Sequence, residues 1–135
     1  MAKKTIVCDT DVMIDYWNEN NQRHLSTKRV IESQIGSDNV ILSAITQMEL
    51  MIGAFNKSEL NRINKNIHQF NIALLDDSIT RSAIHLLNNY KLSHGLALPD
   101  ALIAATTLIL NVELFTYNVK DYKFIDDLEL YTIVY

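Results

Sequence analysis

The sequence has 135 residues, enough for one domain with a buried core, and we expect a single domain over residues 1–135. Its 48% of hydrophobic and 21% of charged residues are typical of a globular protein and exclude a disordered or low-complexity chain. Twelve basic and sixteen acidic residues give a net charge of −4, which excludes a protein that coats nucleic acid by overall positive charge alone.

The first third of the chain predicts a strand, two helices and a second strand. Residues 5–8 form a short apolar, β-branched run that stops at Asp9, as is typical of a buried strand. Apolar residues recur at helical spacing over 12–17 and, after a polar break, over 25–35, where Gly36 would end the helix. Residues 40–42 then predict a second buried strand.

The middle of the chain predicts two helices, a third strand and a further helix. Ser43 is a good cap for a helix over residues 44–55, whose apolar side chains fall three and four positions apart. A second helix is expected over 59–70, a strand over 72–75 and another helix over 79–90.

The last part predicts an almost wholly apolar helix and two strands. Pro99 stands where a helix would begin, preset for the first turn, and residues 101–110 continue that helix. Residues 112–116 and 130–134 predict the two strands. Because strands alternate with helices and consist of continuous apolar runs, we expect an α/β fold. Its mainly parallel central sheet would carry helices on both faces, as a three-layer α/β/α sandwich.

The sequence predicts a cytoplasmic protein that does not cross a membrane. The N-terminal apolar run stops at Asp9, too early for a secretory signal. The most apolar stretch, residues 96–115, is interrupted by Pro99 and Asp100 and is a poor membrane span. Cys8 is the one cysteine and lies in an apolar run, so we expect a packed thiol and no intrachain disulfide.

Four acidic residues fall at the ends of predicted elements or inside an apolar helix: Asp9, Glu49, Asp100 and Asp121. Asp9 and Asp121 follow strands, and helices that follow strands begin at the same edge of a parallel sheet, so the four are expected to converge there. Such carboxylates repel one another unless a cation neutralises them, and oxygen ligands without His or Cys indicate Mg²⁺ or Mn²⁺. Taken singly, Asp9 and Asp100 have another explanation as helix caps or favourable N-terminal charges.

These acids lie in four short motifs. An apolar strand runs into Asp9-Thr10-Asp11, and Thr46 stands three residues before Glu49. The third motif is Leu-Pro-Asp-Ala-Leu-Ile-Ala-Ala over residues 98–105, and the fourth is Thr-Tyr-Asn-Val-Lys-Asp-Tyr over residues 116–122. In this order and spacing the chain resembles the PIN-domain nucleases almost end to end, especially the VapC toxins of toxin–antitoxin pairs.

The resemblance implies an Mg²⁺- or Mn²⁺-dependent endoribonuclease, the toxin of a VapBC-type pair, that hydrolyses RNA phosphodiester bonds. Its catalytic residues and metal ligands would be the acids Asp9, Glu49, Asp100 and Asp121. The hydroxyl groups of Thr10 and Thr116, together with Asn118, would position carboxylates, water or phosphate. Either Asn118 or Asp121 could be the fourth residue of the site. Phosphodiester cleavage needs an activated water and relief of phosphate charge, and a carboxylate-bound metal supplies both.

The resemblance also implies three partners: RNA (transfer or messenger RNA), a cognate antitoxin that inhibits the toxin, and a second copy in a homodimer. An antitoxin segment would lie along the helices of residues 44–70 and place a basic side chain in the acidic site. Four apolar residues could face it: Met48, Met51, Ile52 and Phe55. Ordinary core packing would account for at least half of these. For RNA, Lys120 and Lys123 flank Asp121, whereas Arg23, Lys28 and Arg29 form a cluster that is also typical of a solvated helix face.

Two other functions remain open at this point. A haloacid-dehalogenase-like phosphatase would use Asp9 as nucleophile and Asp11 as general acid, but Val12 and Met13 stand where that motif usually has Gly and Thr. A non-catalytic PIN-fold module would only bind a protein partner, and the intact acids argue against it.

Overall fold

The computed structural model describes residues 4–135 and contains a four-stranded parallel sheet in the order β3-β2-β1-β4. Its strands are β1 (Ile6–Cys8), β2 (Val40–Ser43), β3 (Asn71–Ala73) and β4 (Glu113–Phe115). Because β1 lies between β2 and β4, the residues that follow these three strands meet at one edge of the sheet.

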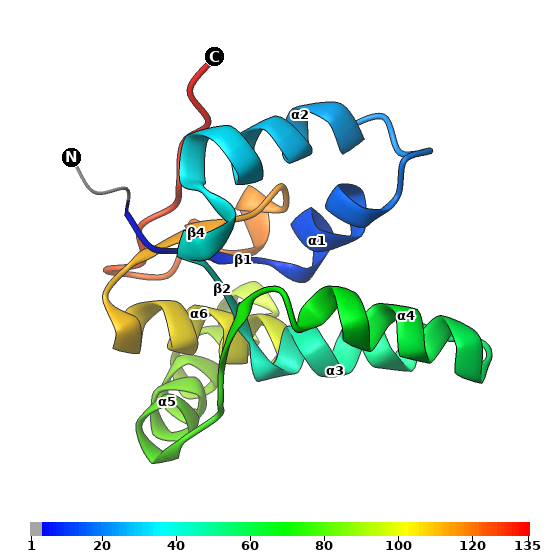
Figure 1. The fold of residues 1–135 in the computed structure, drawn as a ribbon. Coiled ribbons are helices and arrows are strands. Elements are labelled where there is room, and N and C mark those ends of the chain that lie inside the picture. Colours follow the sequence, from blue (N-terminus) through cyan, green and yellow to red (C-terminus); the bar gives the residue numbers. More distant parts are fainter. Residues whose placement is uncertain (1–3) are drawn as a thin grey trace.

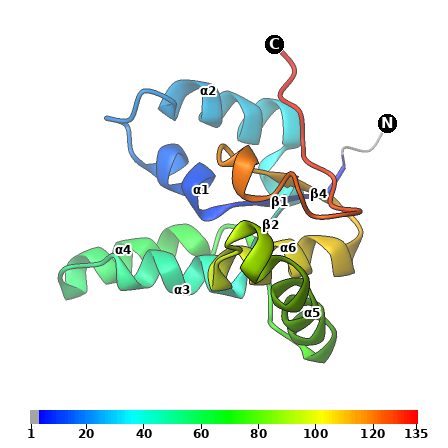
Figure 2. The ribbon, with the colours of Figure 1, turned by 180° about the vertical axis from the view of Figure 1, so that it is seen from behind.

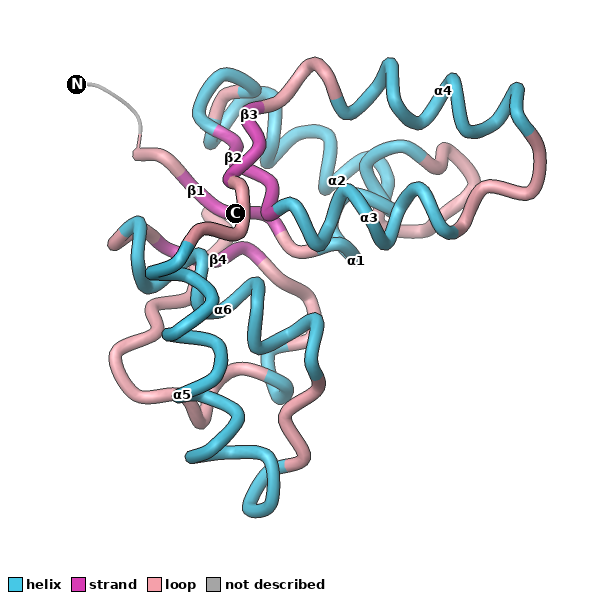
Figure 3. Tube along the Cα trace, turned by 90° about the horizontal axis from the view of Figure 1, so that it is seen from below, coloured by secondary structure: helices cyan, strands magenta, loops and turns pink. Residues whose placement is uncertain are grey.

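Helices cover both faces of this sheet. They are α1 (Thr10–Trp17), α2 (His24–Arg29), α3 (Ala44–Ile52), α4 (Lys57–Ile67), α5 (Asp77–His94) and α6 (Leu98–Leu110). Helices α1 and α2 lie on one side, and α3 to α6 lie on the other (Figures 1 and 2). Seen from below, α3 and α4 run side by side in one arm and α5 and α6 in another (Figure 3). The predicted three-layer α/β/α fold is confirmed.

The core has two halves because alternate side chains of a strand point to opposite faces. Val7 packs with buried residues of α5 and α6, among them Leu86 and Ile103. Its neighbours Ile6 and Cys8 pack on the other face with buried residues of α1 and of the segment after α2. Cys8 has no exposed surface, which confirms the packed thiol.

Local sequence signals begin and end the helices. Ser43, Asn56 and Asp76 each accept a hydrogen bond from a backbone amide in the first turn of α3, α4 and α5. These bonds satisfy donors that have no partner within the helix. Gly95 ends α5 in the left-handed conformation, with φ of 69°. Pro99 lies in the first turn of α6, as predicted.

Some predicted boundaries differ from the structure. The helix after α1 becomes a π-helix over Val30–Ile35, although it ends at Gly36 as expected. The strand predicted over residues 130–134 is wrong beyond its first residue, because only Leu130 pairs with the sheet, opposite Leu114. Further on, the backbone of Val134 hydrogen-bonds the side chain of Gln34 and leaves the sheet. Within residues 4–135, no helix is long and apolar enough to cross a membrane.

Candidate active site

Asp9 lies where β1 passes into α1 and is almost completely buried, with 4% of its surface exposed. One carboxylate oxygen accepts the amide of Thr10 at 2.7 Å, so Asp9 caps α1. The other oxygen accepts the hydroxyl of Thr116 at 2.8 Å, just beyond the neighbouring strand β4. The backbone amide of Asp9 also bonds the carbonyl of Phe115 at 2.9 Å. The cap interpretation of Asp9 is therefore true, and it holds the carboxylate at the sheet edge.

Glu49 reaches the same edge from α3. Its Oε1 accepts the hydroxyl of Thr10 at 2.7 Å, and Thr10 Oγ1 also lies 3.0 Å from Thr46 Oγ1. Thr46 has no exposed surface and stands one turn before Glu49 on the same helix. The residue that follows Asp9 thus links the first motif to the second.

Asp100 lies in the first turn of α6 and is held by a phenol. Tyr122 Oη donates to Asp100 Oδ1 at 3.0 Å, and the Tyr122 side chain has no exposed surface. Burial and the charges of Asp9 and Asp100 raise the pKa of Tyr122 far above its usual value, so its hydroxyl stays protonated and able to donate. The same hydroxyl lies near Asp9 and lowers the pKa of that carboxyl.

The charges of this cluster act on one another. Burial, followed by the charge of Asp11, raises the pKa of Asp9 from 3.8 to about 6. Burial also raises the pKa of Asp100 to about 6, and the charges of three neighbours add to this rise: Asp9, Asp121 and Glu49. Asp100 therefore lies close enough to the other three predicted acids to be repelled by their charges.

Asp121 is a better candidate than Asn118 for the fourth residue of the carboxylate cluster. Asp121 closes a short 3-10 turn after β4, and its charge acts on Asp100. Asn118 is exposed, and its backbone amide donates to Thr116 Oγ1 at 3.0 Å. That bond orients the hydroxyl that holds Asp9, so Asn118 contributes through its backbone. Lys120 lies on this turn and Lys123 lies two residues after it, and both are exposed.

The donor set is suited to a hard divalent cation. It consists of carboxylate oxygens that are partly withdrawn from water and repel one another, and a cation would remove that repulsion. Within the described residues, no group of three or more Asp, Glu, His or Cys side chains is arranged so that it could already hold a metal ion. The chemistry of the donors, rather than a finished shell, is what fits Mg²⁺ or Mn²⁺.

Asp11 lies beside this cluster but is bound differently. Its Oδ1 accepts the amide of Val12 at 2.7 Å, and its Oδ2 accepts the amide of Tyr117 at 3.0 Å. Both oxygens are thus committed to backbone amides. This arrangement fixes the segment after β4 against α1 and does not resemble a general acid that exchanges protons with a substrate.

Replacing Tyr122 with Phe should lower the stability of the metal-free protein at pH 8. The ring would still fill its buried place, but Asp100 would lose a donor to its charged form, which costs about 1.5–3 kcal/mol. Thermal unfolding in EDTA measures this change. Tyr131→Phe is the matched control, because the Tyr131 hydroxyl donates to Gln34 and not to a carboxylate. A Tyr122→Phe loss no larger than the control's would contradict the role given to this hydroxyl.

A groove of about 530 Å³ opens beside the cluster between α1, α3 and α4. Its lining is mixed: it includes the apolar Ile14, Trp17 and Ile63 together with the charged Glu49 and Arg62. On the same helix pair, Ile52 and Phe55 are more than four-fifths exposed, at 83% and 82%, and Met48 is 48% exposed. The expectation that at least half of this apolar set packs into the core is wrong, because none of the four side chains is buried and only Met48 and Met51 are partly covered.

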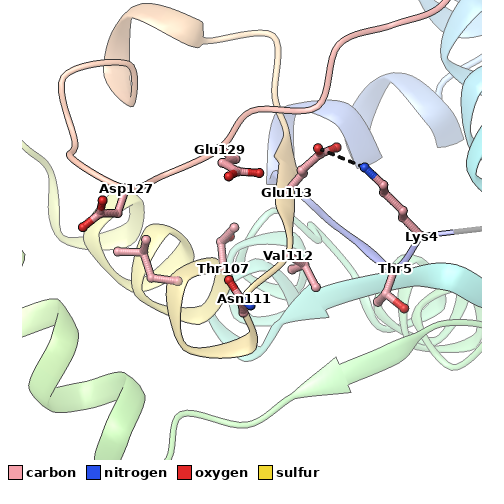
Figure 4. Close-up of a pocket in the computed structure, with 9 residues that line it drawn as sticks. Lys4, Thr5, Thr107, Asn111, Val112, Glu113, Asp127 and Glu129 are labelled. Atoms are coloured by element: carbon pink, nitrogen blue, oxygen red, sulfur yellow. Dashed lines mark ion pairs between the residues drawn. The ribbon is translucent and has the colours of Figure 1, made fainter.

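A second hollow, of about 350 Å³, lies at the opposite end of α6 and β4 (Figure 4). Lys4 and Glu113 form an ion pair of 3.7 Å across its wall, with Asn111 and Glu129 nearby (Figure 4). Because Asp100 is at the start of α6 and Asn111 follows its end, this hollow is remote from the carboxylate cluster. It is not the candidate active site.

The sequence does not reveal the hydroxyl groups around the acids equally well. Thr10, Thr46 and Thr116 belong to the motifs, and the structure gives each a hydrogen bond within the site. The role of Tyr122 is missed, because its motif position calls only for an aromatic ring. The signal available was the choice of Tyr at this position, because a tyrosine that is buried usually has a partner for its hydroxyl.

Comparison with known proteins adds to this geometry. A family model described as the PIN domain matches residues 6–126. A solved toxin-antitoxin complex from Klebsiella pneumoniae is 31% identical, with a TM-score of 0.74, over 96% of this chain and 100% of that one. VapBC-1 from nontypeable Haemophilus influenzae is 24% identical, with a TM-score of 0.72, over 94% of this chain and 96% of that one.

A more distant likeness is to VapC20 of Mycobacterium tuberculosis, described as a toxin that cleaves the sarcin-ricin loop. It is 15% identical, with a TM-score of 0.68, over 84% of this chain and 88% of that one. The likenesses below 25% identity are ones of fold. The comparison with curated proteins found no match.

Proposed function

Because the chain belongs to the PIN domain family, we propose that it is a metal-dependent endoribonuclease that hydrolyses RNA phosphodiester bonds. The observation that carries this proposal is the convergence of Asp9, Glu49, Asp100 and Asp121, from four different elements, at one edge of the sheet. Metal-free, these acids repel one another. That is the arrangement expected of a site that binds a cation and presents it to a phosphate.

In this proposal three of the four acids are each held by a hydroxyl group. Thr116 donates to Asp9, Thr10 to Glu49 and Tyr122 to Asp100. These bonds fix the direction of each carboxylate and leave its remaining lone pairs free for a cation or water. Asp9, Asp100 and Asp121 would hold the ion, and Glu49 would be a further ligand or the base for the attacking water. Bound Mg²⁺ or Mn²⁺ supplies an acidified water and relief of negative charge on the phosphate.

We further propose that the protein is a VapC-type toxin, restrained in the cytoplasm by a cognate antitoxin. The neighbour from Klebsiella pneumoniae is described as a toxin-antitoxin complex, and it matches this chain almost end to end. The groove between α1, α3 and α4 suits such a segment, since apolar side chains could pack on Ile14, Trp17 and Ile63 while a basic side chain reaches Glu49. The exposed Ile52 and Phe55 offer a further apolar surface for the antitoxin or for a second copy in a homodimer.

The proposal is tested by incubating the purified protein with transfer and messenger RNA in Mg²⁺, in Mn²⁺ or in EDTA. We expect cuts that need the metal. A chromogenic phosphate monoester in the same buffers tests the phosphatase alternative, which predicts release of phosphate and intact RNA. Titration with the product of the adjacent gene should then suppress RNA cleavage. Binding of that product by a protein that cuts no RNA under any metal would instead indicate a non-catalytic binding module.

A further inference from the structure

Arg23 is held in one orientation just before α2. Its Nε donates to Asp15 Oδ2 at 2.8 Å, and its guanidinium carbon lies 4.1 Å from the centre of the Tyr117 ring. The ion pair fixes one edge of the planar group, and the ring supports one of its faces. The Tyr117 hydroxyl is hydrogen-bonded to the buried Thr27, so the ring itself cannot turn freely.

The Arg23 side chain is open to solvent, although the carboxylate that pairs with it is buried. The Arg23 side chain is 54% exposed, whereas that of Asp15 is only 8% exposed. Both oxygens of Asp15 are occupied, one by Arg23 and the other by the side-chain amide of Asn21, whose Nδ2 donates at 2.8 Å. Among the hydrogen bonds of the described residues, none uses the two terminal nitrogens of Arg23. The pair therefore shows solvent a planar cationic fork, with its counter-charge buried behind it.

This fork lies next to the proposed active site. Tyr117 directly follows Thr116, which holds Asp9, and the Tyr117 amide donates to Asp11 Oδ2. Burial raises the pKa of Asp11, and the charge of Arg23 opposes that rise, so the two charges are near one another. Lys120 lies on the turn after Tyr117, and Lys123 lies two residues beyond its end. The carboxylate cluster is thus flanked by a fixed arginine toward α2 and by exposed lysines in the segment after β4.

We propose that Arg23, held by Asp15 and stacked on Tyr117, binds a backbone phosphate of the RNA beside the scissile bond. An RNA strand cannot lie across a cluster of four carboxylates in a protein of net charge −4 without local positive charge. A guanidinium fork suits a phosphate because two of its N–H groups can bond two oxygens at once. This inference rests on the proposed function and adds to it a substrate-positioning residue.

The test compares Arg23→Gln with Arg29→Gln. Arg29 is the last residue of α2, the short helix that Arg23 precedes; it is exposed, and its replacement gives the same change of charge. Binding of fluorescein-labelled total transfer RNA is measured in EDTA, where no cleavage occurs, over a series of salt concentrations. Cleavage kinetics are then measured in Mg²⁺ or Mn²⁺, and thermal unfolding reports whether each variant is folded.

We expect Arg23→Gln to weaken RNA binding about tenfold and to reduce the salt dependence by about one phosphate contact, while Arg29→Gln changes binding by about twofold or less. KM should rise by a similar factor with kcat little changed, since the residue positions RNA and does not touch the reacting atoms. Equal effects of the two variants, or a lower kcat at unchanged KM, would overturn the inference.

A second variant covers the case in which Arg23→Gln unfolds. Arg23→Lys keeps a charge that can pair with Asp15 but has no planar fork, and it should still weaken RNA binding several-fold. Wild-type affinity in a folded Arg23→Lys protein would contradict the phosphate fork. The proposed function fails separately, if the wild-type protein cuts no RNA with either metal. If the wild-type protein cuts RNA and the Arg23 variants bind and cut it equally well, this inference is refuted but the proposed function stands.

Discussion

Asp9→Asn should reduce metal-dependent RNA cleavage by roughly a thousandfold or more, with the fold intact. The amide can still cap α1 through its oxygen and can still bond Thr116, so the local structure has what it needs. The change removes one negative charge from the centre of the cluster, where the ion would be held. Initial rates on the RNA species that the wild-type protein cuts, in Mg²⁺ and in Mn²⁺, measure the loss.

The matched control for this prediction is Asp126→Asn. Asp126 is exposed and lies beyond the candidate site, so the same change of charge there should leave the cleavage rate within about twofold of the wild-type rate.

Asp11→Asn separates the nuclease from the phosphatase interpretation, because a phosphatase would need Asp11 as its acid. Full activity in Asp9→Asn protein would refute the role assigned to this carboxylate.

The same Asp9→Asn protein should be more stable than the wild type when both are free of metal at neutral pH. The pKa of Asp9 is raised in the folded protein from 3.8 to about 6, and a difference of that size corresponds to at most about 3 kcal/mol. Because the raised pKa means that folding favours the protonated acid, the charged form destabilises the fold. This penalty is absent below pH 4, grows as the pH rises toward 6 and is complete above that value.

Chemical unfolding in EDTA between pH 4 and pH 8 tests this expectation. The stability advantage of Asp9→Asn should be small at pH 4 and reach its maximum at about pH 7. Added Mg²⁺ should reverse the order, since an ion that binds only the folded wild-type protein stabilises it by mass action. Asp126→Asn again serves as the control. An advantage that does not change with pH would show that Asp9 is not a strained carboxylate.

Much of the fold could be predicted because its signals are local. The apolar run of residues 5–8, the cap at Ser43 and the proline at position 99 each depend on near neighbours, and each is confirmed. The segment after residue 130 is different. Its sequence suits a strand, but β4 is only three residues long and offers a partner to Leu130 alone.

The residues of the candidate site also fall into a predictable and an unpredictable group. The four acids could be found from motif spacing, because the edge of a parallel sheet gathers the residues that follow its strands. The hydrogen bond of Tyr122 to Asp100 and the contact of Arg23 with Tyr117 could not. Both join residues far apart in the sequence, and both depend on how side chains fill space between α-helices and the sheet edge. Local sequence patterns do not predict contacts of this kind.

The place of β1 in the sheet has a consequence for how this protein is made. Asp9 and Thr116, whose side chains bond directly, are 107 residues apart, and β1 has β4 as one of its two partners. A ribosome synthesises Asp9 early and Thr116 near the end of this sequence, so the acidic cluster cannot assemble on a partly made chain. If the protein is the ribonuclease proposed above, an unfinished polypeptide would therefore be harmless to the RNA around it, and the proposed antitoxin would be needed only once synthesis of the domain is almost complete.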